Sequence, residues 1–502
     1  MAHTVSPELS AVALEDYIKR EWLKLVRSHD GLSSAAADSK TLPLPDGRLP
    51  VYLPATEDIH VIESQLRGEM KPADFRRIAL LPLPPDPAEI HHHGLLYLPF
   101  PYLVPGGRFN EMYAWDSFFI QMGLLRDGEV SLARNLADNA LYQVRKYGKV
   151  LNANRTYYLT RSHPPILTEM ILAIFRQTGD RKYLSNSMDA VENYYRFWTE
   201  GPHLIPETGL SRYFDTGSGP APEAVASEFD RRGRPDYDRI RNYYRRRRTS
   251  GYDTRKYYDR SKDQLTLLFY QNDRSMRESG FDPTSRFGLF GAETIDCNPV
   301  CLNCLLYLME SQAAEMLDAL ADGGRASQWR EHAAARARRI NGLMWDSEDG
   351  MYFDYDWVRG SVRRYPFLTT FYPLWVGIAS QEQAARVMSR IELFERPGGL
   401  QASTHRSGDQ WDAPFGWAPL EWIAVQGMRR YGYKTEADRI SQRFIGLVQD
   451  VFRRRGTIVE KYDVLTRNAD VDGELRFGYS TNEAGFGWTN AVYTALLDGL
   501  RK

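Results

Sequence analysis

Three stretches of the chain combine aromatic, arginine and carboxylate side chains in a way that suits a polyhydroxylated ligand. They are residues 104–116 (VPGGRFNEMYAWD), 410–419 (QWDAPFGWAP) and 485–490 (GFGWTN). Aromatic faces can stack on the C–H side of a sugar ring, and arginine forks and carboxylates can bind its hydroxyls. Because the stretches lie far apart in sequence, we expect one aromatic-walled polar pocket assembled from the whole chain. For any single stretch, simple core packing by Trp and Tyr is the alternative.

The motifs of several other chemistries are missing from the sequence. It contains no Gly-rich phosphate loop, no His-Glu-x-x-His helix and no Gly-x-Ser-x-Gly elbow. Many carboxylates stand among the aromatic and arginine residues. For a sugar pocket, the matching chemistry is glycoside hydrolysis by two carboxyl groups, one acid and one base. This chemistry needs no metal or cofactor, and we expect none.

The three cysteines require a separate interpretation. Cys297, Cys301 and Cys304 have the spacing of a radical-type iron–sulfur motif. They fall at the start of a segment, residues 302–320, in which apolar residues recur with helical periodicity. We therefore expect three buried thiols, with a radical iron–sulfur enzyme as the alternative.

Charge and terminal composition limit the partners. The 502-residue chain has 64 basic and 65 acidic side chains, a formal net charge of −1. This balance gives no electrostatic reason to expect nucleic acid or an anionic membrane. The N-terminal residues lack the basic start and apolar run of a signal peptide, and no stretch is apolar enough to span a bilayer. We expect a cytoplasmic protein whose partner is a small molecule.

Helical periodicity dominates the sequence from Asp116 onward. Residues 14–28 predict an amphipathic helix, whereas residues 40–106 are Pro-rich and predict an extended, irregular wrapping arm. Residues 213–275 are polar and rich in Tyr and Arg, which favours a solvated helical insertion over a nucleic-acid patch. Many helices separated by short loops indicate an all-α helical toroid. The helical segments lie near residues 166–175, 185–199, 302–320, 330–345, 381–392, 417–431, 436–452 and 488–499.

From about residue 40 to 499 the chain resembles the trehalases of glycoside hydrolase family 37, most closely the catalytic part of neutral trehalases. The resemblance rests on six stretches in the family's order. It implies an (α/α)6 barrel in a single catalytic domain, residues 1–502, with an arm at 1–105 and a barrel at 106–502. The stretches are 105–116, 151–162, 277–282, 410–419, 458–463 and 485–490.

The resemblance also implies the roles of two carboxyl groups. Asp282 matches the family's general acid and Glu460 its general base, in an inverting mechanism that cleaves α,α-trehalose to two glucose molecules. In such a mechanism the carboxyl groups lie roughly 6.5–9.5 Å apart, which leaves room for a water molecule. Ser250-Gly251-Tyr252-Asp253 imitates the stretch around Asp282 but lacks the preceding Arg-Glu, so Asp282 is preferred over Asp253.

The resemblance also implies substrate-binding residues, which are assigned by matching each position to the family's motifs. Glu111, in the first of these motifs, is interpreted as structural. The substrate-binding residues are Arg108, Phe109, Trp115, Asp116, Asn152, Arg161, Glu223, Arg277, Gly280, Trp411, Asp412, Phe486 and Trp488.

The sequence departs from the family pattern in three places, of which the last two bear on the second sugar site. Residues 219–223 lack the usual arginines, for which Arg277 is a substitute. His163 stands where glutamine is usual. Residues 477–483 replace a glycine-rich lid, and this replacement puts the carboxylate contact of the lid in doubt. An α-glucosidase acting on a kojibiose-like or glucosylglycerate-like substrate is therefore one alternative. A non-catalytic sugar-binding protein is another.

Overall fold

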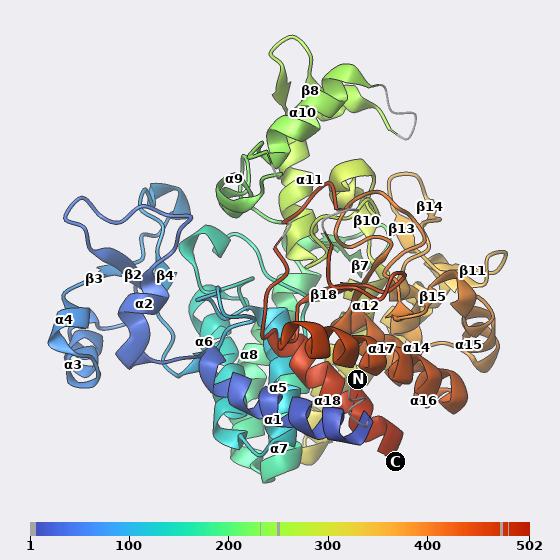
Figure 1. Ribbon diagram of the computed structural model, residues 1–502, viewed down its shortest axis with the longest axis horizontal. Coiled ribbons are helices and arrows are strands. Elements are labelled where there is room, and N and C mark those ends of the chain that lie inside the picture. The colour runs from blue at the N-terminus through green and yellow to red at the C-terminus, as the bar shows by residue number, and fades with distance from the viewer. Residues whose placement is uncertain (1–6, 231, 248–251, 472–474, 480, 502) are drawn as a thin grey trace, which may run out of the picture.

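The computed structural model describes residues 7–230, 232–247, 252–471, 475–479 and 481–501, and most of them lie in a large helical body (Figure 1). Six helices form its inner ring. Each packs on the next, and the last packs back on the first, so the ring closes. In order they are α5 (Ala114–Arg126), α7 (Leu167–Thr178), α12 (Val300–Ala319), α14 (Tyr372–Val376), α16 (Ala418–Arg430) and α18 (Gly487–Arg501).

The outer helices alternate with the inner ones along the chain. Apolar residues of an outer helix recur on one face, as Tyr183, Leu184, Met188 and Val191 do in α8, whereas α5 is buried on nearly all sides. α1 packs on α17 and α18 and completes the outer layer. This arrangement is the expected (α/α)6 barrel. The outer helices are α6 (Val130–Tyr147), α8 (Arg181–Thr199), α13 (Gly323–Leu343), α15 (Gln381–Met388), α17 (Lys434–Arg455) and α1 (Pro7–Leu25).

Local sequence signals explain the tight connections between helices. α7 ends at Gly179, whose φ of 68° suits a residue without a Cβ. The next residue, Asp180, begins α8 by accepting a hydrogen bond from the Tyr183 amide at 3.0 Å. Such short turns join the far ends of the helix pairs, so the longer loops are left at the opposite end, where the inner helices begin.

Those longer loops carry the aromatic and charged stretches of the sequence. They precede α5, α7, α12, α16 and α18, and so meet over the N-terminal ends of the inner helices. β17 (Phe415–Trp417) and β18 (Lys461–Asp463) pair antiparallel and join two of these loops. The other antiparallel pairs are short and turn the chain between helices. They are β1 (Val26–Arg27) with β5 (Tyr102–Leu103), β6 (Leu204–Ile205) with β7 (Leu210–Ser211), β10 (Cys297–Asn298) with β13 (Asp354–Asp356) and β14 (Ser361–Arg363), β11 (Trp345–Asp346) with β12 (Met351–Tyr352), and β15 (Glu395–Arg396) with β16 (Gly399–Leu400).

The Pro-rich arm is more ordered than the sequence predicted. A three-stranded parallel sheet, in the order β3-β2-β4, packs on helices and has its own apolar core, seen on the left of Figure 1. Pro50 fits in β2 because the pairing with β4 begins only at Val51. The expectation of an extended layer was wrong here because the prolines lie at strand ends. The elements are α2 (Leu32–Ala36), β2 (Leu49–Leu53), α3 (Ile59–Glu69), α4 (Pro72–Phe75), β3 (Ile78–Pro82) and β4 (Leu95–Leu96).

The predicted insertion forms the lobe at the top of Figure 1. It contains α9 (Pro222–Ser227), α10 (Asp236–Arg246) and a hairpin of β8 (Tyr258–Asp259) and β9 (Gln264–Leu265). Aromatic side chains, including Tyr244 and Phe269, form a small core inside it. The lobe runs directly into α11 (Leu267–Glu278), which enters the barrel, so the insertion positions the residues that follow α11.

All three cysteines are free and buried, as expected. The Arg286 guanidinium donates to the Cys301 sulfur at 3.5 Å, and burial raises the pKa of each thiol. Within the described ranges, no group of three or more His, Cys, Asp or Glu side chains could hold a metal ion. In the same part of the chain, no helix is both long and apolar enough to cross a membrane.

Candidate active site

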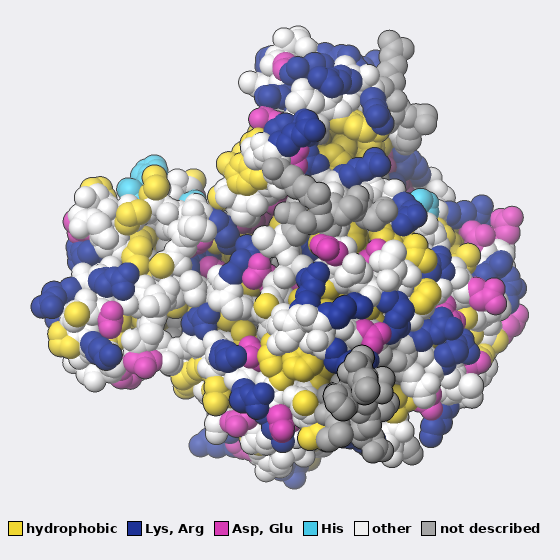
Figure 2. Space-filling model, in the orientation of Figure 1, with side chains coloured by type: hydrophobic (Ala, Val, Ile, Leu, Met, Phe, Trp, Pro, Cys, Tyr) yellow, Lys and Arg dark blue, Asp and Glu magenta, His cyan; other side chains and the backbone are white. Residues whose placement is uncertain are grey.

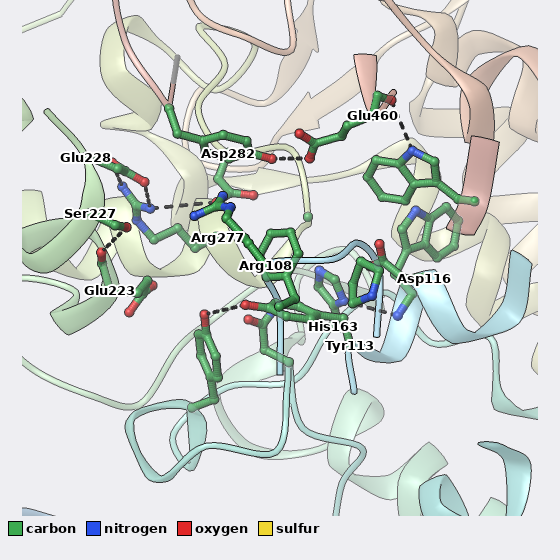
Figure 3. A pocket seen from close by; sticks show the side chains of 18 of the residues that line it. Arg108, Tyr113, Asp116, His163, Glu223, Ser227, Glu228, Arg277, Asp282 and Glu460 are labelled. Atoms are coloured by element: carbon green, nitrogen blue, oxygen red, sulfur yellow. Dashed lines mark hydrogen bonds and ion pairs between the residues drawn. The ribbon is translucent and has the colours of Figure 1, made fainter. Parts of the chain in front are cut away.

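A pocket lies over the N-terminal ends of the inner helices, and residues from all three aromatic stretches line it (Figure 3). The structure brings both candidate acid–base carboxyls into this pocket. With them are all the predicted binding residues except Asp412: Arg108, Phe109, Trp115, Asp116, Asn152, Arg161, Glu223, Arg277, Gly280, Trp411, Phe486 and Trp488.

Asp282 stands just after the end of α11. The turn that presents it passes through Gly280 at a φ of 74°, where an added Cβ would approach His163 Nε2 to 3.1 Å. The Asp282 side chain is 32% exposed, toward the pocket, and Arg277 Nη1 lies 3.7 Å from its Oδ2. Burial raises the pKa of Asp282 to about 7, against the opposing charge of Arg277. A carboxyl with this pKa can carry a proton at neutral pH.

Arg277 is restrained by other carboxylates, which limits its effect on Asp282. Its two terminal nitrogens donate to Glu228 at 2.6 and 2.9 Å, and its Nε donates to Asp273 at 3.1 Å. Asp273 precedes Arg277 by one turn of α11, so the pair lies on one helix face. Because Arg277 is largely neutralised by these partners, Asp282 can keep its raised pKa.

Glu460 is the second carboxyl, and its side chain is only 2% exposed. The Tyr479 hydroxyl donates to its Oε1, and Lys461 Nζ lies 3.9 Å from its Oε2. Oε2 has no hydrogen-bond partner among the described residues. Burial raises the pKa of Glu460, while Lys461 and the Tyr479 hydrogen bond lower it. Its unoccupied oxygen can therefore accept a proton from a water molecule.

Lys461 connects the two carboxyl-bearing segments. Its ammonium donates to the Gln410 side-chain oxygen at 2.9 Å and to the Tyr479 carbonyl at 3.1 Å. The amide nitrogen of Gln410 in turn donates to the carbonyl of Asp282. Burial lowers the pKa of Lys461 to about 8, although the Glu460 charge opposes this shift. One buried chain of hydrogen bonds therefore fixes the segments of Asp282 and Glu460 relative to each other.

Asp116 adds a third carboxyl to the pocket from the first turn of α5 (Figure 3). Burial and the charges of Glu460 and Asp282 raise its pKa well above the usual value. The charge of each of these carboxyls therefore influences the protonation of the others. When Asp116 is neutral, it can donate as well as accept a hydrogen bond.

Arg161 provides a second buried cation. Its Nη2 donates to Glu223 Oε1, and its Nη1 lies 3.6 Å from Asp215. Its Nε and Nη1 and the second oxygen of Glu223 have no hydrogen-bond partner in the described part of the chain. Despite burial, Arg161 and Arg277 lower the pKa of Glu223 to about 2. The pair is thus charged, with donors and an acceptor left unused.

Aromatic rings form the other walls. Trp411 stacks on Trp417 with centroids 3.8 Å apart, and Trp488 meets both rings at their edges. Phe486 lies 4.7 Å from Trp488 and 6.3 Å from Phe109, centroid to centroid. These contacts leave ring faces and charged groups around one pocket, which is the arrangement expected for a sugar.

Comparison with known proteins identifies the family. A family model described as trehalase matches residues 69–501. The chain belongs to the trehalase family. It is 37% identical to the cytosolic neutral trehalase of Saccharomyces cerevisiae over 78% of this chain and 56% of that protein. It is 36% identical to the periplasmic trehalase of Xanthomonas axonopodis pv. citri over 81% of this chain and 69% of that protein.

Solved structures agree on the fold. The neutral trehalase Nth1 from Saccharomyces cerevisiae superposes with a TM-score of 0.80 at 31% identity, covering 98% of this chain and 94% of that one. A family 63 mannosylglycerate hydrolase from Thermus thermophilus, in complex with glucose, gives a TM-score of 0.52 at 16% identity and covers 78% and 95%. The second match supports the barrel architecture alone.

Two departures from the trehalase pattern have clear structural settings. His163 Nδ1 accepts a hydrogen bond from the Trp115 amide at 3.2 Å, so the ring proton is on Nε2. Burial lowers the pKa of His163 to about 3, which keeps the ring neutral. In the lid segment, Arg108 Nε lies 2.7 Å from Glu483 Oε1. The altered lid thus supplies a carboxylate, which pairs with Arg108, one of the predicted sugar-binding residues.

The prediction that Asp412 lines the pocket is not supported. Its carboxylate is completely buried and accepts hydrogen bonds from the hydroxyls of Ser403 and Ser407 and from the Ser285 amide. Asp412 follows Trp411 in sequence but points to the other side of the chain, where it holds the segment after Asp282. Glu111 binds Arg155 at 2.7 Å away from the pocket, in agreement with a structural role.

Several lining residues could not be recognised in the sequence. Some come from the arm, the insertion and the lid segment, none of which belongs to the matched stretches, whereas Pro105, Tyr113 and Tyr158 lie within those stretches but had no role assigned to them. Tyr479 and Glu228 touch the acid–base machinery directly or through Arg277. The full set is Lys40, Pro105, Tyr113, Tyr158, Ser227, Glu228 and Tyr479. Of the decoy motif, Ser250 and Gly251 lie outside the described residues, and Asp253 is exposed and paired with Arg255.

Proposed function

We propose that this protein is an inverting glycoside hydrolase that cleaves α,α-trehalose to two glucose molecules. The observation that carries the proposal is the pair of carboxyls in one pocket, Asp282 with a raised pKa of about 7 and Glu460 with an unoccupied buried oxygen. Membership of the trehalase family supports the choice of substrate. The chain spans 56% of the length of the yeast relative, so its activity requires direct measurement.

Asp282 acts as the general acid in this scheme. Its proton passes to the glycosidic oxygen as the bond from that oxygen to the anomeric carbon breaks, and one glucose leaves as an alcohol. Glu460 Oε2 takes a proton from a water molecule whose oxygen attacks the same carbon from the opposite face. The second glucose is released with inverted configuration, and no step requires a metal or cofactor.

Charged and aromatic side chains bind the two sugars. Arg161 offers unused donors and Glu223 an unused acceptor, a combination that suits vicinal hydroxyl groups. Arg108, Arg277 and Asp116 surround the two catalytic carboxyls, and the rings of Trp411, Phe486, Trp488, Phe109 and Trp115 cover the sugar faces. Because these residues span most of the sequence and Lys40 of the arm also lines the pocket, we infer that residues 1–502 act as one catalytic domain.

A second candidate is an α-glucosidase that acts on another small glucoside. It is favoured by His163, which presents an N–H to the pocket, and by the altered lid that carries Tyr479 and Glu483. Measurement of kcat/KM for trehalose, kojibiose and glucosylglycerate separates the candidates. Trehalose is expected to be the best substrate. A higher kcat/KM for either other compound would favour the second candidate, and binding without turnover would indicate a sugar-binding protein.

We infer a cytoplasmic location for the protein. The cytosolic neutral trehalases of several fungi are similar to it, which supports this location, whereas the similar Xanthomonas trehalases are periplasmic. Cell fractionation with a cytoplasmic and an exported marker tests the inference, and enrichment with the exported marker would contradict it.

A further inference from the structure

A second cavity lies between the insertion lobe and the barrel, apart from the trehalose pocket. It has a volume of about 690 Å³, within the range of small-molecule sites. Its walls come from Phe229, Asp230, Arg232 and Arg234, from α10, from the segment around Phe290, from residues 407–409 and from residues 475–478, which lead into the lid segment. Figure 2 shows dark-blue Lys and Arg side chains gathered over this lobe.

The charge of the cavity differs from that of the whole chain. Its lining includes six arginines, no lysine and two aspartates, whereas the chain as a whole has a net charge of −1. Arg234 pairs with Asp230, and Arg239 pairs with Asp236. No carboxylate among the described residues pairs with the others, which are Arg232, Arg246, Arg247 and Arg476.

Each acidic lining residue is already neutralised or engaged. Asp230 accepts from Arg234 at 2.8 Å. Asp409 accepts from the Ser285 hydroxyl at 2.7 Å, and burial together with Asp412 raises its pKa to about 7. The free cationic charge of Arg246, Arg247 and Arg476 is therefore not balanced by the described residues of the cavity.

We propose that this cavity binds a small organic phosphate, with Arg246, Arg247 and Arg476 on the phosphate group. Arginine forks match phosphate oxygens bidentately, and the exclusive use of arginine favours this geometry over a simple attraction of anions. Tyr243 and Phe290 form an apolar wall of edge-to-face rings beside the arginines, which suits the organic part of such a ligand. The size of the cavity and the neutral chain favour a small ligand over a nucleic acid.

The bound phosphate would contact the segment that supports the catalytic base. Arg476 and Phe477 line the cavity, and Phe477 packs under Arg239 at 4.5 Å. The Gly478 amide donates to Asp236 at 3.0 Å, and the next residue, Tyr479, donates to Glu460. Occupancy restrains this segment against α10, and the rate of hydrolysis is expected to rise as Tyr479 is held in place.

Titration calorimetry tests the site at constant ionic strength, with glucose present to fill the trehalose pocket. The probes are inorganic phosphate, glucose 6-phosphate and ATP. At least one is expected to bind, and the Arg246→Gln/Arg247→Gln and Arg476→Gln variants are expected to bind it about tenfold or more weakly. Arg255→Gln, an exposed arginine of the same lobe outside the cavity, is expected to bind like the wild type.

The pattern across probes identifies the ligand. Equal binding of all three points to the phosphate group alone, and a preference for glucose 6-phosphate or ATP points to a sugar phosphate or a nucleotide. No binding of any probe, or equal weakening in Arg255→Gln, would overturn the proposal. Because binding is measured without turnover, a failed trehalose assay does not affect the result. Binding with an unchanged hydrolysis rate would overturn the coupling to Tyr479.

Discussion

The acid and base sides of the pocket raise the pKa of a carboxyl group with different surroundings. Asp282 is 32% exposed and its nearby cation, Arg277, is held by Glu228 and Asp273. Glu460 is 2% exposed, accepts a hydrogen bond from Tyr479 and has Lys461 at 3.9 Å. On both sides burial raises the pKa and a cation lowers it. What differs is how far the nearby cation is neutralised by other carboxylates, and this difference supports Asp282 as the proposed general acid.

The largest predicted effect comes from removing either carboxyl. Asp282→Asn and Glu460→Gln are each expected to lower kcat on trehalose by about 10²–10⁴-fold, because each removes one proton transfer. Steady-state kinetics measure the loss, and thermal unfolding verifies that the variants fold. A rate near the wild-type value for either variant would remove that residue from the mechanism.

A substrate with a good leaving group separates the two roles. The fluoride of α-glucosyl fluoride leaves with little help from a general acid. Asp282→Asn is therefore expected to retain much of the wild-type rate on this substrate, whereas Glu460→Gln is expected to lose it. Equal losses in both variants would show that the two sides are not specialised as acid and base.

Tyr479→Phe tests the base side alone. The hydroxyl donates to the ionised form of Glu460 and lowers its pKa, so its loss raises that pKa. Glu460 must be ionised to act, and the acidic limb of the kcat profile is therefore expected to move to higher pH, by about one unit. The control is Tyr431→Phe, which removes a hydroxyl that donates to the Ala379 carbonyl at the C-terminal end of α16, opposite the pocket. An unmoved acidic limb in Tyr479→Phe would contradict the role given to this hydrogen bond.

Glu228→Gln tests the acid side and has the smallest expected effect. Glu228 raises the pKa of Asp282 and neutralises Arg277, which lowers it. Glu228→Gln removes a negative charge near Asp282 and leaves Arg277 less neutralised, and both changes lower the pKa of Asp282. Asp282 must be protonated to act, so wild-type activity is expected to fall as the pH rises through about 7, the pKa of Asp282. In Glu228→Gln the alkaline limb of the pH profile, where activity falls, is expected at lower pH than in the wild type. Glu315→Gln, an exposed partner of Arg176, is the control, and a limb that moves upward would contradict the assignment.

The sequence predicted the barrel and most of the site because those features are local or lie in contiguous motifs. Helical periodicity marked α8 and α17, and the stretch around Cys301 was correctly expected to bury its thiols. The parallel sheet around β2 was missed because its pairing joins distant, Pro-rich segments that have no pattern of their own. Asp412 was misplaced because residues 410–414 form turns, which direct its carboxylate to Ser285, Ser403 and Ser407 rather than into the pocket beside Trp411.

The residues that tune the carboxyls were harder to predict than the carboxyls themselves. Glu228 reaches Arg277 from the insertion, and Tyr479 reaches Glu460 from the altered lid segment, over separations of 49 and 19 residues. Neither contact has a sequence signature, because each depends on how a variable segment folds back over the barrel. The motifs therefore point to the proposed chemistry, and the surrounding segments are expected to set its pH range.

The configuration of the first products tests the central claim most directly. In a single proton NMR time course on trehalose, faster than mutarotation, inversion at one anomeric carbon predicts equal initial amounts of α- and β-glucose. The α-glucose is the leaving group and the β-glucose carries the oxygen from the water activated by Glu460. Initial release of α-glucose alone would mean retention, and would contradict the assignment of Asp282 as acid and Glu460 as base.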